Sequence, residues 1–168
     1  RQELVDTGKG LYYLDSAGHP SGNGWTQIKG KWYYLHDGRA HNGWLYDGGS
    51  WYWLDGRSGA MATGWTSVQG SWYYMRSSGA MVTGWLDGGG TWYYLRASGA
   101  MATGWLYDHG SWYYFGSEGM MALGWFSDGS AVYYAAPSGA MATGWLYSNG
   151  SWYYLGSSGS RATGWVLD

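Results

Sequence analysis

The sequence lacks cysteine, contains only two prolines, and has 12% charged residues in a chain of 168. Without cysteine it can form neither disulfides nor thiolate metal sites. No apolar run is long enough to span a bilayer, and the first residues do not read as a signal peptide, so we expect the natural chain to begin before Arg1. Lysine and arginine are scattered and the net charge is −2, which argues against a surface for nucleic acid or anionic membrane.

Glycine and large aromatic residues dominate instead, with 32 glycines, 18 tyrosines and 15 tryptophans. No stretch has the 3.6-residue apolar period of a helix, and the glycine content argues against long helices. The absence of cysteine does not fix a compartment, but it suits an extracellular protein that is held together by aromatic stacking.

One phrase recurs along the chain, and its clearest copy starts at Trp105. It reads Gly-Trp, a short polar tip, Gly-Ser-Trp-Tyr-Tyr, an apolar residue, and a glycine-containing link with a methionine. Gly-Trp occurs at Trp25, Trp44, Trp65, Trp85, Trp105, Trp125, Trp145 and Trp165. A second tryptophan follows seven residues later at Trp32, Trp51, Trp72, Trp92, Trp112 and Trp152. A fixed period of this kind indicates a stacked repeat array.

Asn149-Gly150 predicts that each unit is a β-hairpin, because a two-residue type I′ turn needs positive φ at both central positions. This turn would pair Trp145 with Tyr154 and place Trp152 on the same face. The other face would carry Leu146, Tyr153 and Leu155. Both faces are apolar or aromatic, and an isolated hairpin is only marginally stable in water, so the hairpins must stack.

The two tryptophans of a hairpin lie diagonally on one face, about 7–8 Å apart at the backbone. Their rings can close on each other as a core, or leave a slot that a third ring from the next hairpin turns into a cage. Such cages recognise quaternary ammonium groups through the negative faces of the rings. The pattern alone leaves both possibilities open.

Two parts of the chain are expected. Residues 1–23 form a degenerate N-terminal capping repeat, in which Leu11 stands at a tryptophan position. Residues 24–168 form an array of seven hairpin repeats of about 20 residues that ends in a half repeat at Trp165. The half repeat leaves the Trp145 hairpin incompletely covered, so we expect a ligand-dependent homodimer through the C-terminal end.

The phrase Gly-x-Trp-Tyr-Tyr-Leu-x-x-x-Gly-Ala-Met-x-Thr-Gly-Trp resembles the choline-binding repeat, and the resemblance runs from Gly24 to Trp165. That family anchors surface proteins and cell-wall hydrolases of pneumococci, related bacteria and their phages. The resemblance implies an all-β fold without substantial helix, a left-handed superhelical solenoid of stacked β-hairpins. It also implies an extracellular protein of the bacterial cell wall that binds choline or phosphocholine on teichoic and lipoteichoic acids, without a cofactor.

Carried over from the family, each choline site combines two aromatics of one hairpin with one of the next, often with the link methionine. The sites so implied are Trp25, Trp32 and Trp53; Trp44, Trp51, Tyr74 and Met61; Trp65, Trp72, Tyr94 and Met81; Trp85, Trp92, Tyr114 and Met101; and Trp105, Trp112, Tyr134 and Met121. The second tyrosine of each pair is chosen because it shares a face with the tryptophans.

Departures from the pattern change single sites. Ala40 replaces the methionine expected for the first site, and Val132 removes one wall of the sixth. The sixth site would then keep Trp125, Tyr154 and Met141. The seventh hairpin, at Trp145 and Trp152, has only a half unit after it, and the N-terminal unit should hold no ligand.

Other readings are weaker. The histidines show no metal-ligand spacing, the tip aspartates are turn formers first, and no Ser-His-Asp set or repeated carboxylate pair suggests an enzyme. Two alternatives to choline binding remain, a glucan-type carbohydrate-binding array and a purely structural scaffold with closed cages. Carbohydrate-binding relatives typically lack the second tryptophan and the Ala-Met-x-Thr-Gly-Trp link, so this sequence argues against them.

Overall fold

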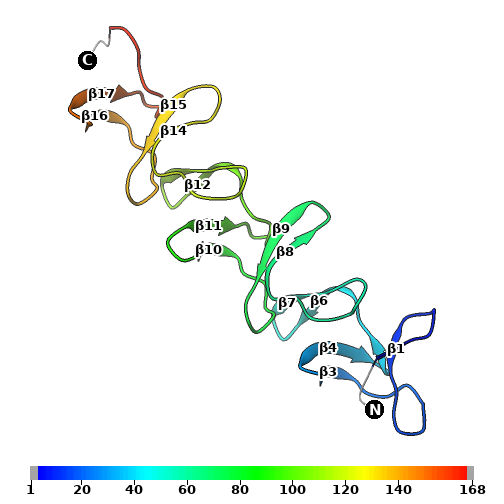
Figure 1. The fold of residues 1–168 in the computed structure, drawn as a ribbon. Coiled ribbons are helices and arrows are strands. Elements are labelled where there is room, and N and C mark those ends of the chain that lie inside the picture. Colours follow the sequence, from blue (N-terminus) through cyan, green and yellow to red (C-terminus); the bar gives the residue numbers. More distant parts are fainter. Residues whose placement is uncertain (1–3, 166–168) are drawn as a thin grey trace. The chain divides into compact units, whose positions relative to one another are not determined.

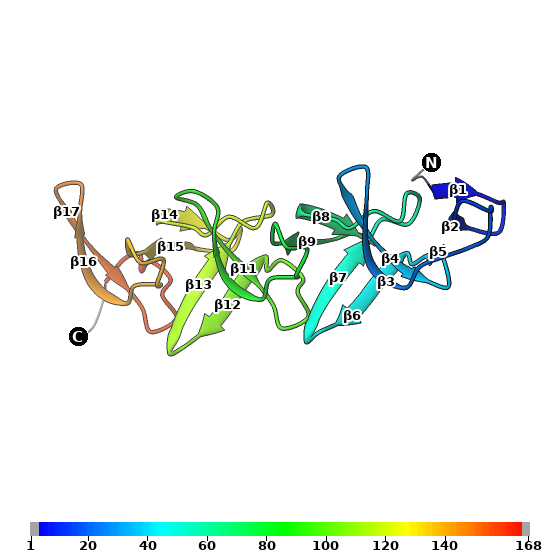
Figure 2. The same cartoon turned by 90° about the horizontal axis from the view of Figure 1, so that it is seen from below.

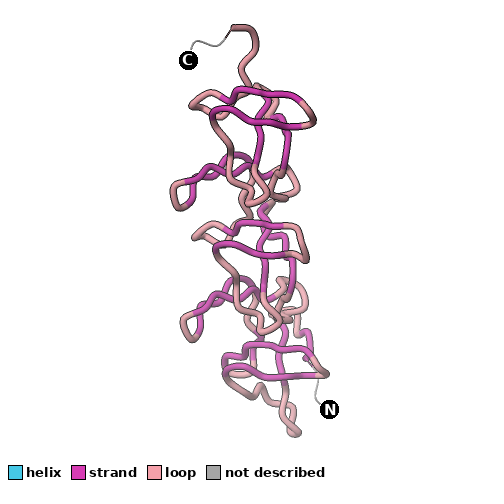
Figure 3. Tube along the Cα trace, turned by 90° about the vertical axis from the view of Figure 1, so that its left-hand side faces the viewer, coloured by secondary structure: helices cyan, strands magenta, loops and turns pink. Residues whose placement is uncertain are grey.

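The computed structural model describes residues 4–165 and contains strands and loops but no helix in this part of the chain (Figures 1 and 3). No helix capable of crossing a membrane therefore occurs there. The strands are β1 (Leu4–Asp6), β2 (Leu11–Tyr13), β3 (Gly24–Ile28), β4 (Lys31–His36), β5 (Arg39–Ala40), β6 (Gly43–Asp47), β7 (Ser50–Leu54), β8 (Gly64–Val68), β9 (Ser71–Met75), β10 (Gly84–Asp87), β11 (Trp92–Leu95), β12 (Gly104–Asp108), β13 (Ser111–Phe115), β14 (Gly124–Ser127), β15 (Val132–Ala135), β16 (Gly144–Ser148) and β17 (Ser151–Leu155).

The chain forms two compact units. Unit 1 runs to Thr83 and includes Ala97–Ala100, and unit 2 comprises Gly84–Arg96 and the chain from Met101 onward. The expected all-β fold of repeated hairpins is confirmed, because each consecutive strand pair from β6 to β17 forms an antiparallel two-stranded sheet. Figure 2 shows β12 and β13 side by side as one such pair.

Unit 1 begins with a five-stranded sheet of order β1-β2-β5-β4-β3. The hairpin β1–β2 places Leu4 opposite Tyr13, where later hairpins pair tryptophan with the second tyrosine. Leu4 and Leu11 pack against the buried side chains of Ile28 and Tyr33. Aliphatic residues thus cover the face that aromatic rings cover in the following repeats.

The turn residues fix the hairpin register as the sequence predicts. Asn149 and Gly150 have φ of 50° and 79°, and Trp145 pairs with Tyr154 across β16 and β17. The same two-residue turn with positive φ occurs at Lys29-Gly30, Gln69-Gly70 and His109-Gly110. A positive φ is unfavourable for a non-glycine residue. These residues adopt it because the two-residue hairpin turn requires it.

Consecutive hairpins stack with unlike faces together, as unit 2 illustrates. Trp105 and Tyr114 lie on one face of β12–β13, with ring centroids 5.2 Å apart. That face meets the opposite face of β14–β15, where Tyr133 lies 4.7 Å from Trp105 and Phe126 stacks on Tyr114 at 5.0 Å. Within unit 2, β12–β13 therefore buries its Trp105 face on the hairpin that follows it, β14–β15.

In each unit, the apolar residue after the Tyr-Tyr pair, or after Tyr52-Trp53, is buried. Leu54, Met75, Leu95, Phe115 and Leu155 are each 0% exposed. Full burial of such a side chain contributes about 1.5–3 kcal/mol. Each of these residues also forms a backbone bridge to the link that follows its hairpin, at Met61, Met81, Met101, Met121 and Arg161 respectively.

Indole N–H groups tie neighbouring hairpins together. Trp105 Nε1 donates to Asp128 Oδ2 at 3.0 Å, and Trp85 Nε1 donates to Asp108 Oδ2 at 2.9 Å. The bond from Trp105, with bonds from the hydroxyl and backbone N–H of Ser130, lowers the pKa of Asp128 far below its ordinary value. The contact with His109, followed by the indole bond, lowers the pKa of Asp108.

The links contain a glycine for a steric reason. A Cβ on Gly139 would overlap Met121 Sδ, so the methionine of one link lies against the glycine of the next. The same overlap would occur between Gly79 and Met61, Gly99 and Met81, Gly119 and Met101, and Gly159 and Met141. The glycine and the methionine of the Ser-Gly-Ala-Met phrase therefore recur because successive links contact each other through them.

Gly139→Ala should destabilise unit 2, because the added methyl group displaces Met121. The matched control is Gly144→Ala, since Gly144 has a similar φ of +80° but nothing within 4 Å of an added Cβ. We expect the free energy of unfolding in urea to fall by about 1–3 kcal/mol more for Gly139→Ala than for the control. Equal losses would mean that backbone strain alone requires the link glycine.

Asp128→Asn should lower stability in a pH-dependent way. Because the folded pKa of Asp128 is lowered, its carboxylate stabilises the fold above the unfolded pKa of about 4 and loses this effect as the pH falls further. The difference in unfolding free energy between the unmodified chain and Asp128→Asn should be present at neutral pH and shrink in acid. Glu118→Gln, which removes the same charge from an exposed link, is the control. A difference that persists unchanged in acid would contradict the account.

Candidate aromatic cages

The cavity at β12–β13 contains three aromatic walls and a thioether. Trp105 and Trp112 have ring centroids 6.4 Å apart at an interplanar angle of 85°. Tyr133 of the next hairpin lies 4.7 Å from Trp105 at 73°. The backbone N–H of Met141 donates to the Trp112 carbonyl at 2.8 Å, which fixes the methionine beside the second tryptophan. The cavity has a volume of about 320 Å³ and is also lined by Ser157 and Ser158.

The same set of residues recurs within each unit. Unit 1 contains Trp25, Trp32, Tyr52 and Met61, and then Trp44, Trp51, Tyr73 and Met81. Unit 2 contains Trp85, Trp92, Tyr113 and Met121, followed by the set at Trp105. In each set a hairpin supplies both tryptophans, the next hairpin supplies its first tyrosine, and the link after that hairpin supplies the methionine. We call these four sets the aromatic cages.

The cages are open rather than closed. Trp92 is 41% exposed and Trp112 is 45% exposed, which is a large exposure for a ring that could have been packed. The first tryptophan of each pair, by contrast, is half-buried in these two cages, because it stacks on the next hairpin. The first tryptophan thus packs on the next hairpin, while the second tryptophan keeps a ring face accessible to solvent.

The structure brings four of the five predicted tryptophan pairs together, those that start at Trp25, Trp44, Trp85 and Trp105, but it groups the third ring differently. Tyr114, expected beside Trp85 and Trp92, instead faces Trp105 of its own hairpin, and Tyr113 closes the cage at 4.8 Å from Trp85. Likewise Trp53, Tyr74, Tyr94 and Tyr134 each face the first tryptophan of their own hairpin. The expectation assumed that the tryptophan face of one hairpin meets the tryptophan face of the next. In the structure, the Trp105 face meets the face of the next hairpin that carries Tyr133.

The methionines are offset by one link from the expected grouping. Met121 lies beside Trp92, not in the cage of Trp105, and Met61 lies beside Trp32. Met81 lies beside Trp51, while Met101 contacts Gly119. Ala40 therefore does not deprive the Trp25 cage of its methionine, because Met61 supplies it. A link passes back to the hairpin before the one it follows, which spacing along the chain cannot reveal.

The remaining predicted residues lie as follows. Trp65 and Trp72 lie in unit 1, and Tyr94 lies in unit 2. At Trp125 the neighbouring ring is Tyr153, 4.8 Å away, rather than Tyr154, and Met141 belongs to the Trp105 cage. Trp145 and Trp152 of the last hairpin are 57% and 65% exposed.

Sequence reasoning missed the aspartates beside three cages. Asp47, Asp108 and Asp128 accept the indole N–H of Trp25, Trp85 and Trp105. Each lies three residues after the next Gly-Trp, and this fixed offset was the available signal. Their negative charges lie near the cage walls, which favours a cationic ligand.

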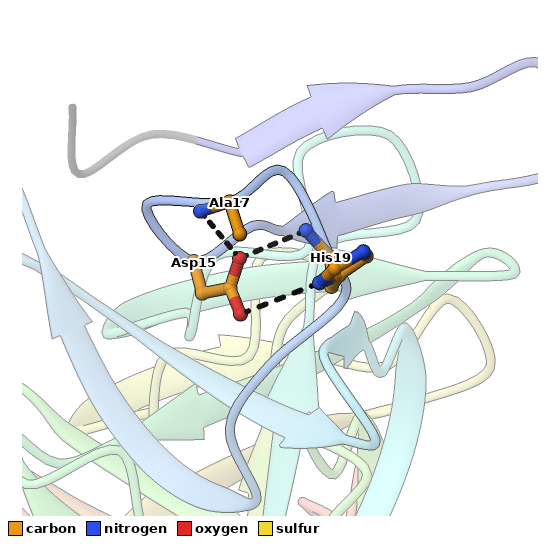
Figure 4. Close-up of polar contacts among 3 residues, drawn as sticks. All are labelled: Asp15, Ala17 and His19. Carbon is orange, nitrogen blue, oxygen red and sulfur yellow. Dashed lines mark hydrogen bonds and ion pairs between the residues drawn. The ribbon is translucent and has the colours of Figure 1, made fainter.

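No set of three or more metal-ligating side chains occurs among residues 4–165. Asp15 shows what one link aspartate does instead (Figure 4). Its carboxylate accepts the backbone N–H groups of Ala17 and His19, each at 2.9 Å, and the bond from His19 contributes most to lowering its pKa. Asp15 closes a turn.

Two family models match the chain. The family model of the choline-binding repeat matches residues 23–64, 62–104 and 102–144, and a model of a cell wall binding repeat matches residues 143–160. Among curated proteins none matches the chain.

Several solved structures are similar. The structure of CbpJ from Streptococcus pneumoniae shares 45% identity over 91% of this chain and 56% of its own, with a TM-score of 0.81. Choline binding protein F from the same species, solved in the presence of a peptidoglycan analogue, shares 42% identity over 94% and 57%, with a TM-score of 0.81. The endolysin from phage Cp-1 complexed with choline shares 37% identity over 72% and 37%, with a TM-score of 0.53.

This chain spans just over half the length of the first two of these structures. The repeat models together extend from residue 23 to residue 160, which is most of the chain. The chain belongs to the choline-binding repeat family.

Proposed function

We propose that this chain holds its carrier non-covalently at a bacterial cell wall by binding choline or phosphocholine of teichoic and lipoteichoic acids in the aromatic cages. The single observation that carries the proposal is the repeated open cage of two tryptophans, one tyrosine and a methionine. The protein would then lie outside the cell, at its surface, and act as a binding module without catalysis or cofactor.

The chemistry of the cage suits a quaternary ammonium group. Such a group cannot donate a hydrogen bond, so it needs negative π faces and polarisable atoms rather than oriented acceptors. The T-shaped arrangement of Trp105 with Trp112 and with Tyr133 directs ring faces of different orientation at one cavity. The nearby carboxylate of Asp128 adds a favourable long-range charge.

Each cage should bind weakly. A cation–π contact gives about 0.5–2 kcal/mol before ordering costs, so a free choline should have a Kd of about 1 mM, or about −4 kcal/mol. Several cages acting on one polymer with many phosphocholine groups can exceed the single-site affinity by roughly 10²–10⁴. Weak single sites are therefore compatible with firm attachment to a wall.

The similar structures support the choice of ligand. The phage Cp-1 endolysin was solved with choline and choline binding protein F with a peptidoglycan analogue. A carbohydrate-binding array and a closed structural scaffold are the alternatives. The exposure of Trp92 and Trp112 speaks against the closed scaffold, and the second tryptophan with the methionine link speaks against a glucan-type array.

Titration with choline, followed by the indole N–H signals in NMR spectra, tests the proposal one cage at a time. Choline should shift the signals of Trp85 and Trp105 with millimolar midpoints, and isomaltose or dextran should not. Trp92→Ala should weaken the response of Trp85 by about 2–30-fold, the loss of one cation–π wall. Tyr147→Ala, which removes an exposed ring outside the four cages, should leave both responses intact. Shifts by dextran but not by choline would overturn the proposal.

We also propose that the C-terminal end forms a homodimer when ligand is bound. Trp152 is 65% exposed, against 45% for Trp112, and Trp145 is 57% exposed, so an aromatic face lies without a following hairpin among the described residues. Sedimentation velocity with and without choline should show a choline-dependent dimer that Trp152→Ser abolishes. A monomer at all protein and choline concentrations would remove this proposal.

A further inference from the structure

The position after the Trp105 cage is built from different residues. Its first tryptophan is Trp125, and Tyr153 of the next hairpin lies 4.8 Å from it, as in a cage. The second tryptophan is replaced by Val132, and the methionine is replaced by Arg161. We call this set the sixth position.

Arg161 occupies the methionine place by its backbone. Its N–H donates to the Val132 carbonyl at 2.7 Å, just as the N–H of Met141 donates to Trp112 at 2.8 Å. Arg161 also bridges Leu155 across the start of its link, in the way that Met121 bridges Phe115. The two links therefore follow the same path, and the side chain of Arg161 starts where a cage methionine starts.

The guanidinium of Arg161 lies over the ring of Trp125. Its Cζ is 6.0 Å from the ring centroid, within the range of a cation–π interaction. No carboxylate in residues 4–165 forms an ion pair with this side chain. The ring of Trp125 therefore lies against a cation of the same chain, the guanidinium of Arg161.

The two substitutions fit each other. A tryptophan at residue 132 would place a second ring beside Trp125, as Trp112 lies beside Trp105 in the preceding cage. Valine lacks that ring, while arginine is longer than methionine and carries a positive charge that the negative face of the Trp125 ring attracts. A methionine in the same place would offer a thioether to a ligand but could not replace the ligand.

We propose that the sixth position is occupied by the guanidinium of Arg161 and is closed to choline while that side chain lies over Trp125. The proposal rests on the proposed function of the cages. A tethered side chain competes at an effective concentration of about a millimolar or more, comparable to the choline concentration that half-fills a cage. With one ring wall missing as well, free choline cannot displace Arg161 at concentrations that fill the other cages.

The test compares Val132→Trp, Arg161→Met and the double variant, with Arg96→Met as a control that removes the same charge elsewhere. In the unmodified chain the indole signal of Trp125 should stay in place at choline concentrations that saturate Trp85 and Trp105. In the double variant it should shift with a midpoint close to that of Trp105. Val132→Trp alone should bind choline about 3–30-fold more weakly at this position than the double variant, the fold-change expected for one competing cation–π contact.

A second readout needs no choline. Ring current from Trp125 should move the Arg161 Nε proton upfield of that of Arg96 in the ligand-free chain, and Trp125→Leu should abolish the difference. An unshifted Arg161 proton would overturn the proposal. So would a response of Trp125 in the unmodified chain at the same midpoint as Trp105, or equal choline binding by Val132→Trp and the double variant. If no tryptophan responds to choline, the proposed function fails. The chemical shift of the Arg161 Nε proton then still shows whether the guanidinium lies over the Trp125 ring.

Discussion

The stacking of unlike hairpin faces is the interaction on which the rest of the structure depends. Each hairpin has two apolar faces and cannot be stable by itself, so within each unit the aromatic pairs and the link methionines contact neighbouring hairpins and links. Trp105 shows the consequence, because it packs on Tyr133 and at the same time walls a cavity with Trp112. The candidate site is therefore not an addition to the fold. It is the rim of the contact that holds two hairpins together.

The two tryptophans of a hairpin have different roles in stacking and in the cage. The first is half-buried, stacks on the next hairpin and, in three cages, donates its indole N–H to an aspartate. The second stays more than 40% exposed at Trp92 and Trp112. Because the first ring and the link methionine are fixed by packing, little ordering is needed when a ligand arrives, and a weak contact is not weakened further. Repetition then supplies the strength that a single cavity lacks.

Sequence reasoning reached the hairpins but not the way they meet. Asn149-Gly150 gave the register of β16–β17 residue by residue, since a type I′ turn admits one pairing. The choice between Tyr113 and Tyr114 could not be made, because both faces of the hairpin are aromatic and periodicity does not say which face meets which neighbour. The methionine offset was hidden for a related reason, since the link of Met141 reaches back across a whole hairpin to Trp112. Val132 was recognised as a departure from the repeat pattern. That Arg161 lies next to the same tryptophan, Trp125, became clear only from the structure.

The central claim is that choline lies between two tryptophans of one hairpin and the first tyrosine of the next. A crystal structure of the chain soaked in choline, with occupancy refined cage by cage, tests it most directly. The account predicts a trimethylammonium group against Trp105, Trp112 and Tyr133, with the Met141 thioether beside it. Choline bound against Tyr134 or Tyr114, or a cage closed by rotation of Trp112 onto Trp105, would contradict the account.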